Sequence, residues 1–149
     1  MDSAKRGNMP QSFKTLYRVS WVDTDAAQIV HFSNFFRFFE RAEEEFYGQL
    51  GLLGWLGAKD IIMPRVEAYC QYKKPAKFND LLEIELTVEE LKEKAVKYGF
   101  KIYNKETAEL LADGYIVAVA VNRHTLKAVQ IPREVVEKFK AFSKSDGEK

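Results

Sequence analysis

Residues Val22–Ala42 decide the fold, and they read VDTDAAQIVHFSNFFRFFERA. The first part, residues 23–28, has the Asp-rich composition of a turn. Ser33 or Asn34 is a good N-cap for a helix that follows. From there to about Leu50, apolar residues recur at intervals of three and four. This spacing predicts a helix with one apolar stripe, formed by Phe35, Phe39, Ala42 and Phe46.

The predicted helix is apolar around most of its first half, because Phe36 and Phe38 widen the stripe. Such a helix is usually buried against a large surface. Its solvent side is expected to carry Arg41, Glu43, Glu44 and Glu45. Glu40 is the acidic residue nearest the apolar part, so its carboxylate must be paired, hydrated or functional, and we expect pairing.

Most of the remaining chain alternates apolar and polar residues, which predicts strands. We expect strands at residues 13–22, 63–73, 82–89, 96–103, 110–121 and 127–131, and a short helix at 132–142. In the strand at 110–121, Ala118 and Ala120 are small enough to let the long helix approach closely. Four glycines between residues 48 and 57 mark a loop with about one helical turn.

One helix followed by a run of antiparallel strands favours an α+β fold over an α/β fold. The simplest arrangement that buries both parts is a long central helix wrapped by a curved antiparallel sheet of five to six strands. With 149 residues the chain has room for one such domain, which we expect at residues 13–142 between flexible tails at 1–12 and 143–149.

The composition excludes several classes of protein. Lys and Arg number 23 against 22 Asp and Glu, a balance that argues against nucleic-acid binding. No apolar run approaches the ~20 residues of a membrane helix, and the N-terminus has no secretory signal. A single cysteine suits a reducing compartment. We therefore expect a cytoplasmic protein that does not insert into membranes.

Asp23 and Asp25 lie between a strand end and a helix start, where a carboxylate has two uses. The more ordinary one is to form a turn. Alternatively, the helix N-terminus binds an oxyanion while a nearby carboxylate attacks a substrate or activates water. Spacing leaves both uses open. The pattern does not fit a calcium loop, and we expect no metal site.

Few other residues are candidates for chemistry. His31 could donate to a ligand carbonyl or be an ordinary loop histidine. Cys70 alternates with apolar residues and is expected in the core. Lys73, Lys74 and Arg133 suit phosphates, although such charges are more often ordinary surface.

Two stretches resemble a known family. Residues 22–42 resemble the signature of hotdog-fold acyl-CoA thioesterases of the 4-hydroxybenzoyl-CoA thioesterase-like family, above all in the DTDxxxxV start and the FERA of residues 39–42. Residues 72–76, YKKPA, and 79–83, NDLLE, resemble the family's second common stretch. The resemblance covers most of the predicted domain.

The resemblance implies a hotdog fold and an acyl-CoA substrate hydrolysed without a cofactor. It also implies homodimers whose sheets join edge to edge, with dimers of dimers in some members and active sites at the dimer interface. The family's catalytic aspartate corresponds to Asp25, which would act as nucleophile or as general base. The oxyanion-hole N–H corresponds to that of Phe32, with the Ser33 N–H beside it.

The resemblance also implies binding residues. His31, Lys73, Lys74 and Arg133 would contact the substrate, the three cations through coenzyme A phosphates. The aromatic helix and Trp21 would form an apolar acyl pocket.

Two departures affect substrate choice and rate more than reaction class. Many members have Gly where this chain has Gln28, and many related members have Tyr-His where this chain has His31-Phe32.

Two other functions compete with hydrolysis. One is a non-catalytic hotdog module that binds acyl-CoA. The other is a hotdog dehydratase, which would use a histidine with an acidic partner, and His31 is poorly placed for that role.

Overall fold

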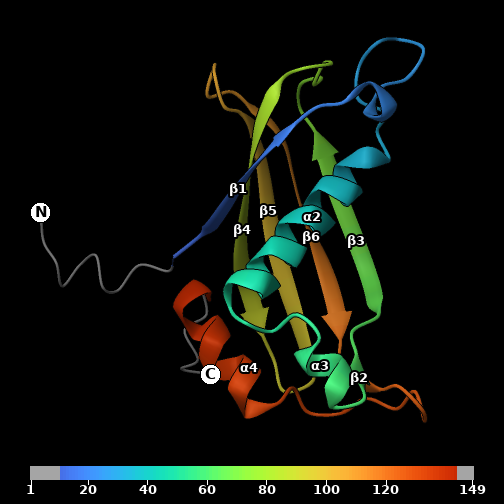
Figure 1. Ribbon diagram of the computed structural model, residues 1–149, viewed down its shortest axis with the longest axis vertical. Helices are drawn as coiled ribbons and strands as arrows, with labels where there is room; N and C mark the ends of the chain where they lie inside the picture. The colour runs from blue at the N-terminus through green and yellow to red at the C-terminus, as the bar shows by residue number, and fades with distance from the viewer. Residues whose placement is uncertain (1–10, 144–149) are drawn as a thin grey trace, which may run out of the picture.

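One long helix lies across one face of an antiparallel sheet (Figure 1). The computed structural model describes residues 11–143. The helix is α2, Asn34–Gln49. The sheet has the order β1-β4-β5-β6-β3. Its strands are β1 Phe13–Arg18, β3 Arg65–Tyr72, β4 Leu81–Leu91, β5 Ala95–Asn104 and β6 Leu110–Val119. The α+β class and the long central helix are confirmed.

The core lies between α2 and the sheet. Inward residues of β4 alternate as the sequence predicts, and Leu82, Ile84, Leu86 and Val88 are fully buried. The Phe39 ring stacks on Phe100 of β5, with centroids 4.4 Å apart and planes 6° apart. On β6 the buried face carries the expected residues, Ile116 and Ala118.

Shorter elements close the ends of this layer. They are the 3-10 turn η1 at Trp21–Asp23, the helix α3 at Trp55–Ala58, the two-stranded sheet of β2 Ile61–Ile62 with β7 Val121–Asn122, the helix α4 at Arg133–Phe139 and the 3-10 turn η2 at Lys140–Phe142. The short C-terminal helix and the helical turn after α2 were both expected. Gly51 and Gly54 adopt φ of 73° and 77°, which favours glycine at these two bends.

Three strand predictions need correction. The strand expected at 13–22 ends at Arg18, because η1 begins at Trp21. The strand at 110–121 breaks at Ala120, whose N–H and C=O pair with Lys94 and Val129 outside the main sheet. The segment at 127–131 forms an isolated bridge between Ala128 and Val121 instead of a strand.

Two burial predictions were also wrong. Glu43, expected on the solvent side of α2, is buried, whereas Glu40 is exposed. Cys70 was expected in the core, but it is only half-buried on the edge strand β3. Burial raises the pKa of the Cys70 thiol to about 11.

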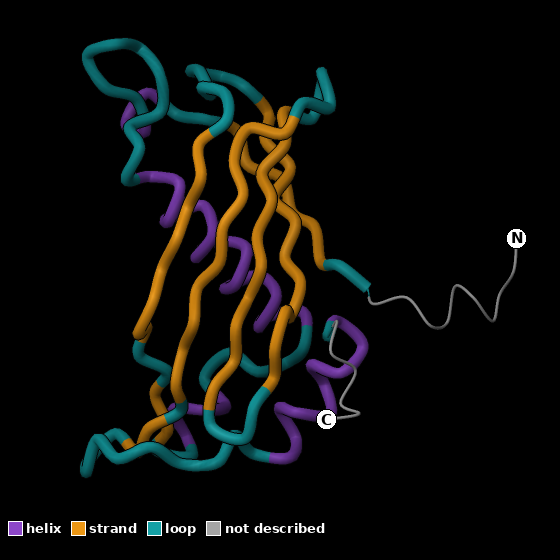
Figure 2. Tube along the Cα trace, turned by 180° about the vertical axis from the view of Figure 1, so that it is seen from behind, coloured by secondary structure: helices purple, strands orange, loops and turns teal. Residues whose placement is uncertain are grey.

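β3 is an edge strand with unusual exposure. Every residue from Arg65 to Tyr72 is exposed except Cys70, and the exposed set includes the apolar Val66 and the aromatic Tyr69. Within residues 11–143, no helix covers the face of the sheet opposite α2 (Figure 2). The structure therefore presents a free, partly apolar strand edge, which proteins seldom leave unprotected.

The predicted tails, 1–12 and 143–149, lie mostly outside the described residues, and the domain limits remain a prediction. Near both limits the described chain makes contact, because the Gln11 N–H donates to the Ala141 carbonyl at 2.8 Å. None of the helices within residues 11–143 is long and apolar enough to cross a membrane.

Candidate active site

The loop between β1 and α2 is built around the buried Asp23. Its Oδ2 accepts hydrogen bonds from the Tyr17 hydroxyl at 2.6 Å and from the Ser20 N–H at 2.9 Å. Its carbonyl accepts from the His31 N–H and from Asn34 Nδ2. Asp23 therefore ties the end of β1 to the start of α2, which is the turn-forming role that the sequence left open for it.

Asp25 has a different environment. It is partly exposed, and its Oδ1 accepts one hydrogen bond, from the Ala27 N–H at 2.8 Å. Its Oδ2 has no hydrogen-bond partner within residues 11–143. The loop closes behind it, because the Asp25 N–H donates to the Ile29 carbonyl and Thr24 forms a bridge with Val30. The carboxylate of Asp25 is thus held by a closed loop with one oxygen available.

Gln28 occupies the tightest point of this loop with a φ of 69°. This left-handed conformation favours glycine, the residue that the family resemblance led us to expect at this position. In this chain the Gln28 N–H donates to the Asp25 carbonyl at 2.8 Å, so the turn forms despite the side chain.

The residues that lead into α2 form a second group. The Ser33 N–H donates to His31 Nδ1 at 3.3 Å, so in the neutral histidine the ring proton is on Nε2. Ser33 Oγ lies 2.8 Å from the same Nδ1, and the His31 ring stacks on Phe32. The Ser33 side chain makes no cap hydrogen bond to α2. The Ser33 N–H is therefore already engaged within the loop.

The carbonyl group of Phe32 is held by two hydrogen bonds. Its oxygen accepts from the Tyr72 hydroxyl at 2.9 Å and from the Phe35 N–H at 3.3 Å. Within residues 11–143 the Phe32 N–H has no acceptor. An immobilised N–H beside a helix start is the type of donor that stabilises a developing oxyanion.

A cavity of about 250 Å³ lies beside Phe32. Its lining joins the loop to the end of β3 and comprises Ile29, Val30, Phe32, Phe35, Tyr72, Lys73, Lys74 and Pro75. The predicted lysines therefore do lie with Phe32. Lys73 donates to Gln71, and Lys74 forms an ion pair of 3.0 Å with Glu109.

Two predicted residues lie elsewhere. Arg133 begins α4, near the end of the sheet opposite to the end of β3 at Tyr72 (Figure 1), and it lines a separate cavity. Trp21 contacts Phe78 instead of lining a pocket with α2, and it is 77% exposed. Within one chain neither residue joins the group around Asp25 and Phe32.

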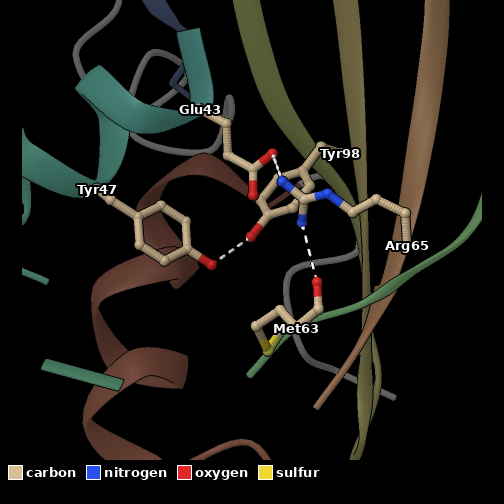
Figure 3. Close-up of polar contacts among 5 residues, drawn as sticks. All are labelled: Glu43, Tyr47, Met63, Arg65 and Tyr98. Carbon is tan, nitrogen blue, oxygen red and sulfur yellow. Dashed lines mark hydrogen bonds and ion pairs between the residues drawn. The ribbon is translucent and has the colours of Figure 1, made fainter. Parts of the chain in front are cut away.

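Sequence reasoning missed one polar cluster entirely. Arg65, at the start of β3, forms an ion pair of 2.6 Å with the buried Glu43 of α2 (Figure 3). Nearby, the hydroxyls of Tyr47 and Tyr98 lie 2.6 Å apart. A signal was present in the sequence, because Glu43 is four residues after Phe39 and three before Phe46, on the flank of the apolar stripe.

Comparison with known proteins identifies the family. The thioesterase-like superfamily matches residues 19–139. The chain belongs to this superfamily. It is 34% identical over 131 residues to a putative esterase of Aquifex aeolicus, with 83% of this chain and 94% of that protein covered. It is also 28% identical over 133 residues to the acyl-CoA thioester hydrolase YbgC of Escherichia coli, with 86% and 96% covered.

Solved structures agree with this assignment. A 1,4-dihydroxy-2-naphthoyl-CoA thioesterase from Synechocystis superposes with a TM-score of 0.81 at 24% identity, with 87% of this chain and 96% of that one covered. At that identity the likeness establishes the fold. The chain is thus a hotdog-fold enzyme of the thioesterase class.

Replacing Asp23 should lower the free energy of unfolding more than replacing Asp25. Asp23→Ala leaves the Tyr17 hydroxyl and the Ser20 N–H without their acceptor, so we expect a loss of about 1–3 kcal/mol in the free energy of unfolding. Asp25→Ala removes one exposed hydrogen bond and should cost less than ~1 kcal/mol. Urea denaturation of both variants measures the difference, and equal losses would contradict the role given to Asp23.

Proposed function

We propose that this enzyme hydrolyses acyl-CoA thioesters to the free acid and coenzyme A, with Asp25 as the catalytic carboxylate. The observation that carries the proposal is that one loop holds both an available Asp25 oxygen and, seven residues later, an unengaged Phe32 N–H. Relatives named as acyl-CoA thioester hydrolases support the substrate class.

The chemistry requires little more than these two groups. A thiolate is a good leaving group, since an ordinary thiol has a pKa of about 8.5, so no strong general acid is needed. Asp25 Oδ2 attacks the thioester carbonyl and expels the coenzyme A thiolate, and water then hydrolyses the resulting mixed anhydride to the free acid. Alternatively, Asp25 removes a proton from a water that attacks the carbonyl and displaces the same thiolate. The Phe32 N–H donates to the oxygen on which negative charge develops.

The cavity beside Phe32 gives coenzyme A an entry. Lys73 and Lys74 line it and would bind phosphate oxygens. Lys74 would have to exchange Glu109 for a phosphate. Both members of that pair are half-exposed, so the exchange costs little. Arg133 is distant from this cavity and is left out of the proposed site.

The free edge of β3 supports a homodimer, as the sequence resemblance implied. Two copies related by a two-fold axis can pair their β3 strands antiparallel and extend one sheet across both. This pairing would cover the exposed Val66 and Tyr69 edge. It would also place the Tyr72 end of each β3, and with it the cavity beside Phe32, next to the Arg65 end of the partner's β3.

Asp25→Asn should abolish most of the activity. Asparagine is nearly isosteric but can act neither as nucleophile nor as base, so we expect kcat to fall by at least ~100-fold with little change in KM. Asp23→Asn is the matched control and should cost less, since Asp23 acts through the turn. Steady-state hydrolysis of octanoyl-CoA measures both. A folded Asp25→Asn enzyme with the parent rate would disprove the mechanism, and inactivity of the parent enzyme towards a panel of acyl-CoA esters would favour a binding module.

The two lysines should matter only for the nucleotide part of the substrate. Changing Lys73 and Lys74 together to Ala should raise KM for octanoyl-CoA several-fold. It should leave KM for the octanoyl thioester of pantetheine, which lacks the nucleotide, nearly unchanged. Equal effects on the two substrates would show that the lysines do not bind the phosphates.

The protein should not be a monomer in solution. Light scattering at micromolar concentration should give the mass of two chains, or of four if dimers pair again. A species with the mass of one chain would rule out the edge-to-edge assembly.

A further inference from the structure

The start of α2 lies beside the end of β3 (Figure 1), and one side chain joins the two. The hydroxyl of Tyr72, the last residue of β3, lies 2.9 Å from the Phe32 carbonyl oxygen. The hydroxyl is the donor, because a carbonyl oxygen can only accept. The mechanism given above uses the Phe32 N–H and gives the Tyr72 hydroxyl no part.

Two consecutive peptide groups meet at Phe32, and together they carry two carbonyls and two N–H groups. The His31 carbonyl accepts from the Asn34 N–H at 2.9 Å, and the Ser33 N–H donates to His31 Nδ1. The Phe32 carbonyl has the two donors described above. Within residues 11–143, the Phe32 N–H is the one group of the four that has no partner. The backbone is therefore fixed on every side except the one that faces a ligand.

Tyr72 differs from the other partners of these peptides because it belongs to the sheet. The others lie within three residues of Phe32 in the chain. They fix the local conformation of Phe32 but not its place relative to β3. Tyr72 is itself held by the sheet, since it pairs with the buried Ala112 of β6. Its hydroxyl therefore sets the position of the Phe32 peptide relative to the strands.

The ring of Tyr72 makes separate contacts with the same segment. It meets the Phe35 ring edge-on, with centroids 5.2 Å apart and planes at 86°, and the Phe32 ring at 6.4 Å and 89°. Edge-to-face pairs of this kind are favourable. The ring packs against side chains, whereas the hydroxyl holds the backbone, so a change to phenylalanine separates the two contributions.

The position of an oxyanion donor affects the rate more than it affects substrate binding. A backbone N–H stabilises the developing charge best when it already points to the place where that charge appears. The ground-state carbonyl oxygen carries little of this charge, so a displaced donor costs stabilisation of the transition state more than affinity for the substrate. A side chain that fixes the Phe32 peptide should therefore affect kcat more than KM.

We propose that Tyr72 is a positioning residue for the oxyanion hole. Its hydroxyl holds the Phe32 peptide against the end of β3, so that the Phe32 N–H points at the thioester oxygen in the transition state. The inference rests on the proposed function, in which the Phe32 N–H is the oxyanion donor.

Tyr72→Phe tests this role because it removes the hydroxyl and keeps the ring. The side chain of Tyr72 is 44% exposed and the Phe32 carbonyl keeps its bond from the Phe35 N–H, so the variant should fold normally. With octanoyl-CoA we expect kcat to fall by about tenfold, less than the ~100-fold or more that loss of an oxyanion donor costs, with KM almost unchanged. An unchanged kcat would overturn the proposal. A raised KM with the parent kcat would also overturn it, because the hydroxyl would then bind substrate.

Tyr69→Phe is the matched control. Tyr69 lies on the same strand and is similarly exposed, at 46%, but its ring stacks on Tyr115 of β6 instead of contacting the loop before α2. Both kinetic constants of this variant should equal those of the parent enzyme. Equal losses of kcat in Tyr69→Phe and Tyr72→Phe would assign the effect to the strand edge as a whole and would contradict the proposal.

A measurement without substrate keeps this inference separate from the proposed catalysis. The NMR order parameter of the Phe32 N–H should have the value of rigid backbone, about 0.85, in the parent and in Tyr69→Phe, and it should fall in Tyr72→Phe. The same value in all three proteins would overturn the proposal. An inactive parent enzyme would count against the proposed function, whereas an active parent with an unchanged Tyr72→Phe variant would count against this inference alone.

Discussion

The burial of one aromatic face of α2 against the sheet is the constraint on which the rest of this structure depends. The parallel stack of Phe39 on Phe100 fixes the middle of the helix over β5, and Phe46 lies between Phe13 and Phe139 at its far end. Aromatic rings bury a large apolar area with few rotatable bonds, so they fix position as well as contributing stability. With the helix axis set, the peptide of Phe32 and the flank of Glu43 both have fixed places relative to the strands.

Asp23 fixes the loop between β1 and α2 relative to both of these elements. Its side chain accepts hydrogen bonds from Tyr17 and Ser20, and its carbonyl accepts from Asn34 at the start of α2, so Asp23 ties the loop to both elements. Asp25 sits two residues later with one oxygen unengaged within the described chain. The two aspartates therefore have different roles. Asp23 holds the loop in place, and Asp25 keeps a carboxylate oxygen available for a substrate.

The sequence predicted the fold well where a single periodicity dominates. The alternation in β4 and the helical spacing in α2 both follow from burial on one side only, and both were confirmed. It failed where tertiary contacts override local pattern. The alternation of residues 63–73 suggested one buried face, but β3 is an edge strand, so Cys70 is only half-buried. The arginine at position 65 could not be linked to Glu43, because their contact depends on how β3 passes α2. Arg133 was grouped with Lys73 and Lys74 because of its charge, but charge alone does not indicate where a residue lies in the fold.

The presence of the buried Glu43–Arg65 ion pair is difficult to explain by a contribution to the free energy of unfolding. Burial raises the pKa of Glu43, and the charge of Arg65 only opposes that shift. A carboxyl whose pKa is raised on folding weakens the fold while it is ionised, and this cost is relieved only as the pH falls through the raised value. Replacing such a pair by apolar side chains is often neutral or favourable, by about 1–4 kcal/mol. Leu53 and Met63 line the cavity beside this pair and show that apolar residues are accommodated there. The ion pair at this position therefore adds little to the free energy of unfolding, although it joins the start of β3 to α2.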